Sequence, residues 1–233
     1  FNPAWRIPLE SRLPIDRAMT LDAGAATRAI RSGPVRESAV FDVFDPITYA
    51  KGGSVLSMLE QWIGADKFQR GLAAYMKGQR LSNATAADLW HHIGQAAGKD
   101  VRAMAASWTD QPGFPLVEVD SRCEAGRQRV TLAQSRFSLG QAAGDAQLWK
   151  IPLSMSRSRQ VWTVMLDSAQ RSVELGACSA VPVVVNAGGQ GFYRVAYGAE
   201  TRRALVQRFP DLPAADRVAL LSDSFALMQS GRL

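Results

Sequence analysis

The chain has 233 residues, of which 47% are hydrophobic and 21% are charged, a composition that suits a globular protein with a filled core. At about 150 residues per domain, this length predicts one large domain or two smaller ones. The longest apolar run, Ala180 to Val185, is far shorter than the ~18 residues that a membrane-spanning helix needs, which excludes a transmembrane segment.

The net charge of +6 makes nucleic acid a partner to consider. The positive residues are nevertheless spread over the whole chain, and the densest groups alternate along expected strands, as on a solvated sheet face. These groups are Arg122, Arg127, Arg129, Arg136, Arg157 and Arg159. We therefore expect no nucleic-acid partner.

The first half of the chain has apolar residues at helical spacing. A first helix is expected between Pro14 and Ile30. Four successive helices are then predicted around Val55–Trp62, Phe68–Met76, Leu89–Ala97 and Val101–Trp108. Three glycines stand at their expected ends, Gly64, Gly78 and Gly98, and Thr85 with Asp88 resembles a capping box. Four aromatic residues are expected to pack on helix faces: Trp62, Tyr75, Trp90 and Trp108.

Alternation of apolar and polar residues replaces the helical spacing after the segment Thr109 to Pro115. Seven short strands are predicted, at 116–120, 129–133, 149–156, 161–166, 172–175, 181–185 and 192–197. Turn residues separate them, which favours a small antiparallel sandwich. Pro152 cannot donate a ladder hydrogen bond and is expected on an edge strand. We also expect the helices before this change and the strands after it to form separate cores.

Helical spacing returns from Ala199 onward. A short helix is expected around Leu205–Phe209 and a longer one over Leu212–Gly231. The longer helix has one apolar face, formed by Val218, Leu221, Phe225 and Met228. We expect this face to pack against a part of the protein that is absent from this chain.

No complete active site can be assembled from the sequence. A zinc site requires three or four ligands, for instance two histidines one helical turn apart. The only two histidines are His91 and His92, and as neighbours on a helix they diverge by about 100° and cannot both face one metal. Cys123 and Cys178 share no motif with each other or with a histidine. A disulfide between them and two separate thiols both remain open.

Five stretches of the sequence resemble one known family. FDPITYAKGGSVLSMLEQWIGADKFQRGLAAYM, LSNATAADLW and SWTDQPGFPLVEV are similar to the region that follows the metal site in the aminopeptidase N family of zinc aminopeptidases. VNAGGQGFYRVAY and LPAADRVALLSDSFAL resemble the junction between that family's sandwich domain and its C-terminal helical domain. The stretches occur in the family's order, from about Thr20 to the last residue.

The resemblance implies an α+β multidomain fold. Residues 1–112 would be the helical C-terminal part of a thermolysin-like peptidase domain. Residues 113–197 would be a β-sandwich domain, and residues 198–233 the first helices of a C-terminal α-helical domain. The sequence begins at Phe1 rather than at an initiator Met, and we expect a fragment of a longer protein. Its partners would be a peptide substrate and the missing N-terminal and C-terminal parts of the same protein.

Tyr49 is the one catalytic residue that the resemblance assigns. A tyrosine of the family points into the zinc site from the start of a helix and donates a hydrogen bond to the oxyanion; the motif TYAKGG identifies it as Tyr49. A phenol with a pKa of about 10 stays protonated at neutral pH and can make this donation. Lys51 and Gly52 would support or pack behind the site, with glycine allowing a close approach. Alternatively, Tyr49 is a boundary residue whose hydroxyl meets a backbone carbonyl.

The sequence also departs from the family. It lacks the HExxH zinc motif, the helix that carries the third ligand, and the motif that holds the substrate amino terminus. We therefore expect a zinc-dependent aminopeptidase in the full-length protein, but neither bound zinc nor peptide cleavage in this fragment alone. The alternative is a noncatalytic relative that keeps the fold as an interaction scaffold. No motif indicates a substrate preference or a compartment.

Overall fold

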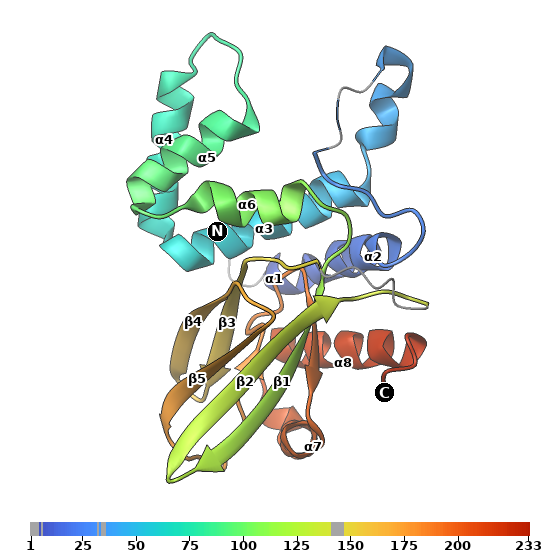
Figure 1. The fold of residues 1–233 in the computed structure, drawn as a ribbon, viewed down its shortest axis with the longest axis vertical. Coiled ribbons are helices and arrows are strands. Elements are labelled where there is room, and N and C mark those ends of the chain that lie inside the picture. The colour runs from blue at the N-terminus through green and yellow to red at the C-terminus, as the bar shows by residue number, and fades with distance from the viewer. Residues whose placement is uncertain (1–4, 6, 32, 34–35, 141–146) are drawn as a thin grey trace.

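The computed structural model describes residues 5, 7–31, 33, 36–140 and 147–233. The structure is mixed α+β, as expected. The helices of the first half lie above two small sheets, and the last two α-helices lie beside the sheets (Figure 1).

Six α-helices precede the sheets in the described part of the chain. They are α1 (Ile7–Glu10), α2 (Arg12–Asp22), α3 (Gly52–Ile63), α4 (Ala65–Gly78), α5 (Ala86–Ala97) and α6 (Val101–Thr109). Between α2 and α3 lie a 3₁₀ helix, η2 (Glu37–Val43), and a π-helical turn, η3 (Ile47–Lys51). The four successive helices that we predicted are confirmed as α3 to α6. The helix expected between Pro14 and Ile30 is observed as α2, which already ends at Asp22. The side chain of Asp22 binds Lys51, a partner from another segment of the chain.

The predicted helix ends are largely confirmed. Thr85 and Asp88 form the capping box at the start of α5, where the Thr85 amide donates to Asp88 Oδ2 at 2.8 Å. Gly64 and Gly98 follow α3 and α5 with positive φ angles, whereas Gly78 is the last residue of α4.

The aromatic residues of the helices pack as their spacing predicted. Trp108 is completely buried, and Trp62 and Trp90 are partly buried against the core. Tyr75 is half-buried, with its ring centroid 6.3 Å from that of His92. Close contact between α4 and α5 requires Gly71, because a Cβ atom there would lie 2.6 Å from the Cα of the facing residue on α5.

Seven strands form two sheets in the part of the chain that the structure describes. They are β1 (Pro115–Glu124), β2 (Arg127–Arg136), β3 (Ile151–Arg157), β4 (Gln160–Leu166), β5 (Gln170–Ala177), β6 (Val184–Val185) and β7 (Arg194–Tyr197). One sheet has the order β5-β2-β1-β7 and the other the order β4-β3-β6. Each strand corresponds to a predicted one.

Two expectations about the sheets are wrong. β1 and β7 pair in parallel, with Leu116 opposite Arg194, because the long connection through the second sheet returns the chain in the direction of β1. Pro152 lies on β3, which is the middle strand of its sheet rather than an edge. The proline is tolerated there because β6 is short and pairs only with Met155 and Ser156, so Pro152 has a strand partner on one side.

The buried apolar side chains form one cluster that runs through both helices and sheets. The ring centroids of Trp108 on α6 and Trp149 before β3 lie 6.3 Å apart. Phe114, just before β1, packs between Phe137 and Phe192 at centroid distances of 5.4 and 5.3 Å. The prediction of separate cores is therefore wrong, because large aromatic residues at the junction join the two halves.

The chain ends in α7 (Ala199–Gln207), a short 3₁₀ helix η4 (Phe209–Asp211) and α8 (Ala214–Gln229). α8 contacts β7 and buries Ala219, Asp223, Ala226 and Leu227. The apolar face that we predicted on this helix is formed by residues other than these buried ones. Its residues are 40% to 60% exposed: Val218, Leu221, Phe225 and Met228. Packing of that face against another part of the protein stays a prediction.

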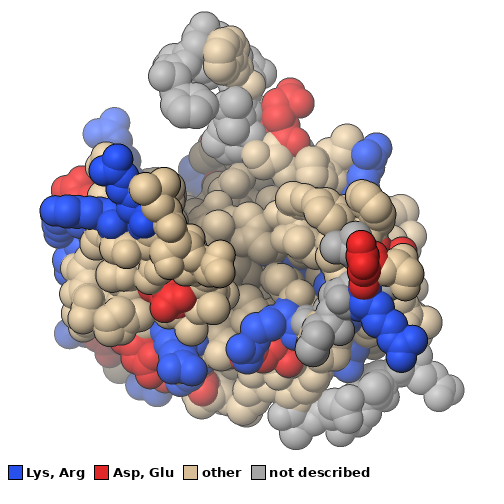
Figure 2. Space-filling model, turned by 90° about the horizontal axis from the view of Figure 1, so that it is seen from above, with Lys and Arg blue, Asp and Glu red and all other residues tan. Residues whose placement is uncertain are grey.

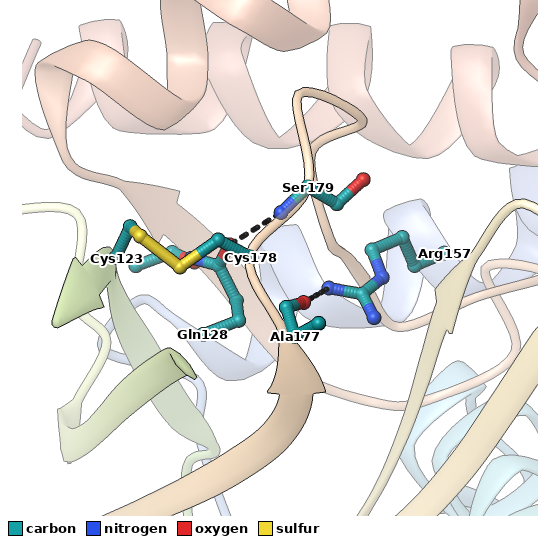
Figure 3. The surroundings of a disulfide bond; sticks show 7 residues. Cys123, Gln128, Arg157, Ala177, Cys178 and Ser179 are labelled. Carbon is teal, nitrogen blue, oxygen red and sulfur yellow. Dashed lines mark hydrogen bonds between the residues drawn. A yellow bond between two sulfur atoms is a disulfide. The ribbon is translucent and has the colours of Figure 1, made fainter. Parts of the chain in front are cut away.

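Cys123 at the end of β1 and Cys178 after β5 form a disulfide (Figure 3). This decides between the two alternatives that the sequence left open. Beside it, the buried guanidinium of Arg157 donates to the carbonyls of Leu175 at 3.0 Å and Ala177 at 3.2 Å. The expectation that Arg157 lies on a solvated sheet face is therefore wrong, because its side chain joins β3 to β5 of the other sheet.

Most other charged side chains of the sheets are exposed. Arg122, Arg127 and Arg129 pair with the neighbouring carboxylates of Asp120, Glu174 and Glu124. On the face seen from above the helices, positive and negative residues are interspersed rather than gathered by sign (Figure 2). Within the described ranges, no helix combines the length and the hydropathy needed to cross a membrane.

Candidate functional site

The first four residues of the motif TYAKGG lie in the π-helical turn η3 (Ile47–Lys51), and its two glycines begin α3. Ile47 and Lys51, the first and last residues of η3, are completely buried, whereas Tyr49 between them is 61% exposed. Residues two apart on a helix point to nearly opposite sides, so the burial of Lys51 turns Tyr49 outward. π-helical turns are rare and are found frequently at functional sites.

The ammonium group of Lys51 has two partners inside the protein. Its Nζ donates to Asp22 Oδ2 at 3.0 Å and to the Gly113 carbonyl at 2.8 Å. Asp22 Oδ1 accepts hydrogen bonds from the Gly113 amide at 3.1 Å and from the Thr27 hydroxyl at 2.7 Å. Both charges of this buried pair are therefore compensated, as burial away from water requires.

Burial dominates the electrostatics of Lys51. Removal from water lowers the pKa of Lys51, and the charge of the Asp22 carboxylate opposes this shift without cancelling it. The Nζ atom also lies 5.8 Å from the centroid of the Phe192 ring, within the range of a cation–π interaction. Lys51 is thus a packed position, as expected.

Gly52 does not have the close neighbour that we expected. A Cβ atom at Gly52 or at Gly53 would meet no described atom within 4 Å. Nothing in the described part of the chain requires glycine at either position.

A second ion pair holds the start of the η3 turn. Arg28 binds both carboxylate oxygens of Asp45, at 3.1 and 2.6 Å, and also donates to the Thr48 hydroxyl at 2.6 Å. Asp45 Oδ1 accepts the Thr48 amide at 2.8 Å. Burial alone would raise the pKa of Asp45, but the hydrogen bonds from Thr48 and the charge of Arg28 outweigh it and lower the pKa.

The Tyr49 ring belongs to a row of exposed aromatic side chains. Its centroid lies 6.1 Å from that of Phe44, and Phe44 lies 6.1 Å from Phe41. No hydrogen bond joins the Tyr49 hydroxyl to a residue that the structure describes. The alternative in which this hydroxyl meets a backbone carbonyl is therefore not seen within the described ranges.

Sequence reasoning singled out Tyr49 and Lys51 but missed the carboxylates and the arginine that hold them. Asp45 stands three residues before Thr48, a spacing typical of capping, and could have been found on that ground. Asp22 and Arg28 carry no local signal, because their partners lie on other segments of the chain.

The described residues do not form a zinc site. They contain no group of three or more His, Cys, Asp or Glu side chains that could hold a metal ion. The two carboxylates that support the η3 turn, Asp22 and Asp45, are each already paired with a cation. The expectation that zinc ligands lie in other parts of a longer protein stays a prediction.

Comparison with known proteins shows that this chain is similar to one family of peptidases. The model of the peptidase family M1 domain matches residues 3–108. The leucyl aminopeptidase of Saccharolobus solfataricus is 32% identical over 219 residues, which cover 93% of this chain and 26% of that protein.

Two further relatives come from other organisms. The tricorn protease-interacting factor F2 of Thermoplasma acidophilum is 33% identical over 196 residues, covering 83% of this chain and 23% of the relative. Aminopeptidase M1-A of Oryza sativa subsp. japonica is 31% identical over 243 residues, covering 100% of this chain and 27% of the relative. The chain thus spans about a quarter of the length of these curated relatives.

Proposed function

Because this chain belongs to the peptidase family M1, we propose that it is part of a zinc-dependent aminopeptidase in which Tyr49 stabilises the oxyanion. The activity would be the hydrolysis of N-terminal residues from peptides, in keeping with the names of two relatives, leucyl aminopeptidase and aminopeptidase M1-A. The observation that carries the role of Tyr49 is an exposed tyrosine on a turn that is anchored on both sides.

The chemistry of the reaction explains why a tyrosine suits this place. Amide hydrolysis passes through a tetrahedral species whose former carbonyl oxygen carries negative charge, and a preorganised donor stabilises it. A phenol O–H is such a donor at neutral pH. The Tyr49 hydroxyl has no partner among the described residues, so it is available to a substrate oxygen, and its neighbours Thr48 and Lys51 are already fixed.

We also propose the division into residues 1–112, 113–197 and 198–233 as three parts of that longer protein. The family match ends at residue 108, close to the change from helical to alternating periodicity, which supports the first boundary. These parts would share one core rather than fold independently. Zinc would be held by other parts of the protein, since the described residues offer no set of ligands.

The substitution Tyr49→Phe in the full-length protein tests the catalytic role. It removes one hydroxyl and keeps the ring, so folding and zinc content are expected to be unchanged. The turnover number is expected to fall by roughly 10²-fold to 10³-fold, as for other oxyanion donors. Steady-state kinetics on a peptide substrate, together with thermal melts and metal analysis, provide the measurement.

Tyr75→Phe is the matched control, because Tyr75 is a half-buried tyrosine on α4 outside the η3 turn. It is expected to leave turnover unchanged. A Tyr49→Phe variant with the parent's turnover would rule out the catalytic role. A full-length protein with no peptidase activity and no bound zinc would favour the interaction scaffold instead.

A further inference from the structure

Tyr49 lies between two anchored residues of the η3 turn. On one side, Thr48 is held by Arg28 through its hydroxyl. On the other side, Lys51 is held by Asp22 and Gly113. The Lys51 anchor is the deeper one: the side chains of Lys51 and Asp22 are completely buried, whereas those of Arg28 and Asp45 are each 23% exposed.

The Lys51 anchor joins segments that are distant in the sequence. Asp22 ends α2, and Gly113 lies between α6 and β1, where the chain passes from the helices to the sheets. Short π-helical turns are rare, and tertiary contacts therefore decide whether such a turn persists. Three hydrogen bonds among Lys51, Asp22 and Gly113 provide such contacts at the buried face of η3.

We propose that Lys51, paired with Asp22, is a positioning residue that fixes η3 so that the Tyr49 hydroxyl points at the substrate oxygen. The inference rests on the proposed function of Tyr49. Lys51 itself is completely buried and touches no substrate, so it acts only through Tyr49.

The direction of the hydroxyl matters for the rate. A hydrogen bond weakens steeply as its angle departs from linearity, and a misplacement of about 1 Å can cost roughly 10²-fold in rate. Tyr49 is two residues from Lys51, and its hydroxyl lies at the end of the phenol ring that is farthest from the backbone. A small rotation of the η3 backbone therefore moves the donor by a large distance.

The test is a double-mutant cycle in the full-length protein. Lys51→Met alone leaves the Asp22 carboxylate buried without its cation and can prevent folding. The paired substitution Lys51→Met/Asp22→Asn removes both charges, and the asparagine keeps an acceptor for the Gly113 amide. The pair is introduced into the parent and into the Tyr49→Phe variant, and kcat, KM and Tm are measured for each.

In the parent, the paired substitution is expected to lower kcat by about 10-fold to 10²-fold, with little change in KM. In the Tyr49→Phe variant, the same pair is expected to change kcat by less than about threefold, because no hydroxyl remains to be positioned. A loss of stability alone would reduce the amount of folded enzyme equally in both backgrounds.

Arg157→Met is the matched control. It also replaces a buried cation that donates to backbone carbonyls, but Arg157 is the last residue of β3, whereas the residues just before that strand contact Trp108 of α6. It is expected to lower Tm and to leave kcat per folded molecule within about twofold in both backgrounds.

Each outcome has a distinct meaning. Equal losses of kcat in both backgrounds, or no loss in the parent, would overturn the role of Lys51 and leave the proposed role of Tyr49 intact. If Tyr49→Phe by itself keeps the parent's kcat, both proposals are overturned. That single variant therefore distinguishes failure of the inference from failure of the proposed function.

Discussion

A network of paired charged side chains holds α2 and α8 to β7. Arg12 on α2 donates to Asp223 on α8 at 3.2 Å. Arg194 on β7 lies 2.8 Å from Asp16 on α2 and 3.1 Å from Asp223. Asp223 also accepts the Val195 amide at 3.2 Å. Because removal of one partner leaves an uncompensated charge away from water, these side chains depend on one another.

Asp16 makes this dependence measurable through pH. Its burial would raise its pKa, but the charges of Arg12 and Arg194 outweigh burial and lower the pKa. A lowered folded-state pKa means that the carboxylate stabilises the fold above its unfolded pKa of about 3.9, and that this contribution is lost as the pH falls through the folded pKa. Asp16→Asn is therefore expected to lower the free energy of unfolding by about 1 to 3 kcal/mol at pH 7.

The difference between Asp16→Asn and the parent should begin to shrink as the pH falls below about 4, where the unfolded chain takes up the proton. It should disappear only when the pH has also fallen through the lowered folded-state pKa, because the folded parent's carboxylate is then protonated as well. Denaturant unfolding at pH 7 and at successively lower pH measures it. Asp167→Asn is a suitable control, since Asp167 is an exposed residue after β4. A difference that stays constant across this range would show that the charge of Asp16 is not what stabilises the fold.

Strand β1 extends well beyond its neighbour β7, whereas β5 accompanies β2 as far as the turn between β1 and β2. β7 pairs with β1 only from Leu116 to Val119, so the distal half of β1 has β2 alone beside it. The disulfide from Cys123 to Cys178 joins this distal half to the end of β5, across β2. It therefore fastens the part of the sheet that has the fewest strand partners.

Removal of the disulfide is expected to destabilise the sheet region. The bond joins residues 55 apart in the sequence, and loss of a native disulfide typically costs about 2 to 5 kcal/mol. Cys123→Ser/Cys178→Ser should accordingly lower Tm, and a reductant should lower the Tm of the parent but not that of the variant. A parent whose melting temperature is the same with and without reductant would contradict this prediction.

One hydrophobic core spans the helices and the sheets. Trp108 and Trp149 meet at the junction, and the Trp108 indole N–H donates to the carbonyl of Lys150 at 3.0 Å. Gly113, at the same junction, connects to Lys51 behind the η3 turn. The sheets therefore contribute to the support of the candidate site.

The 233-residue chain by itself is expected to hold no tightly bound zinc and to hydrolyse no aminoacyl anilide. Its sequence has no HExxH motif, and three protein ligands are the minimum for a catalytic zinc site. Metal analysis of the purified chain after dialysis, with an activity assay in the presence of added zinc, measures both. One retained zinc per chain would contradict the prediction.

Much of the architecture could be predicted from the sequence because periodicity is a local property. Apolar residues that recur about every 3.6 residues indicate a helix with one apolar face, and apolar residues at every second position indicate a strand. Helices α3 to α6 and all seven strands were therefore found from their own residues. The family resemblance likewise identified Tyr49 from a short motif. Local spacing does not specify strand partners, however, and the parallel pairing of β1 with β7 was missed.

The contacts that hold the candidate site join segments that are distant in the sequence. Lys51 and Asp22 are separated by 29 positions, and Lys51 and Gly113 by 62, so no spacing rule connects them. Trp108 and Trp149, which join the two expected cores, belong to segments before and after the same junction. The physical reason is common to both cases: burial and charge pairing depend on which segments the folded chain brings together, whereas the sequence pattern records only each segment's own preference.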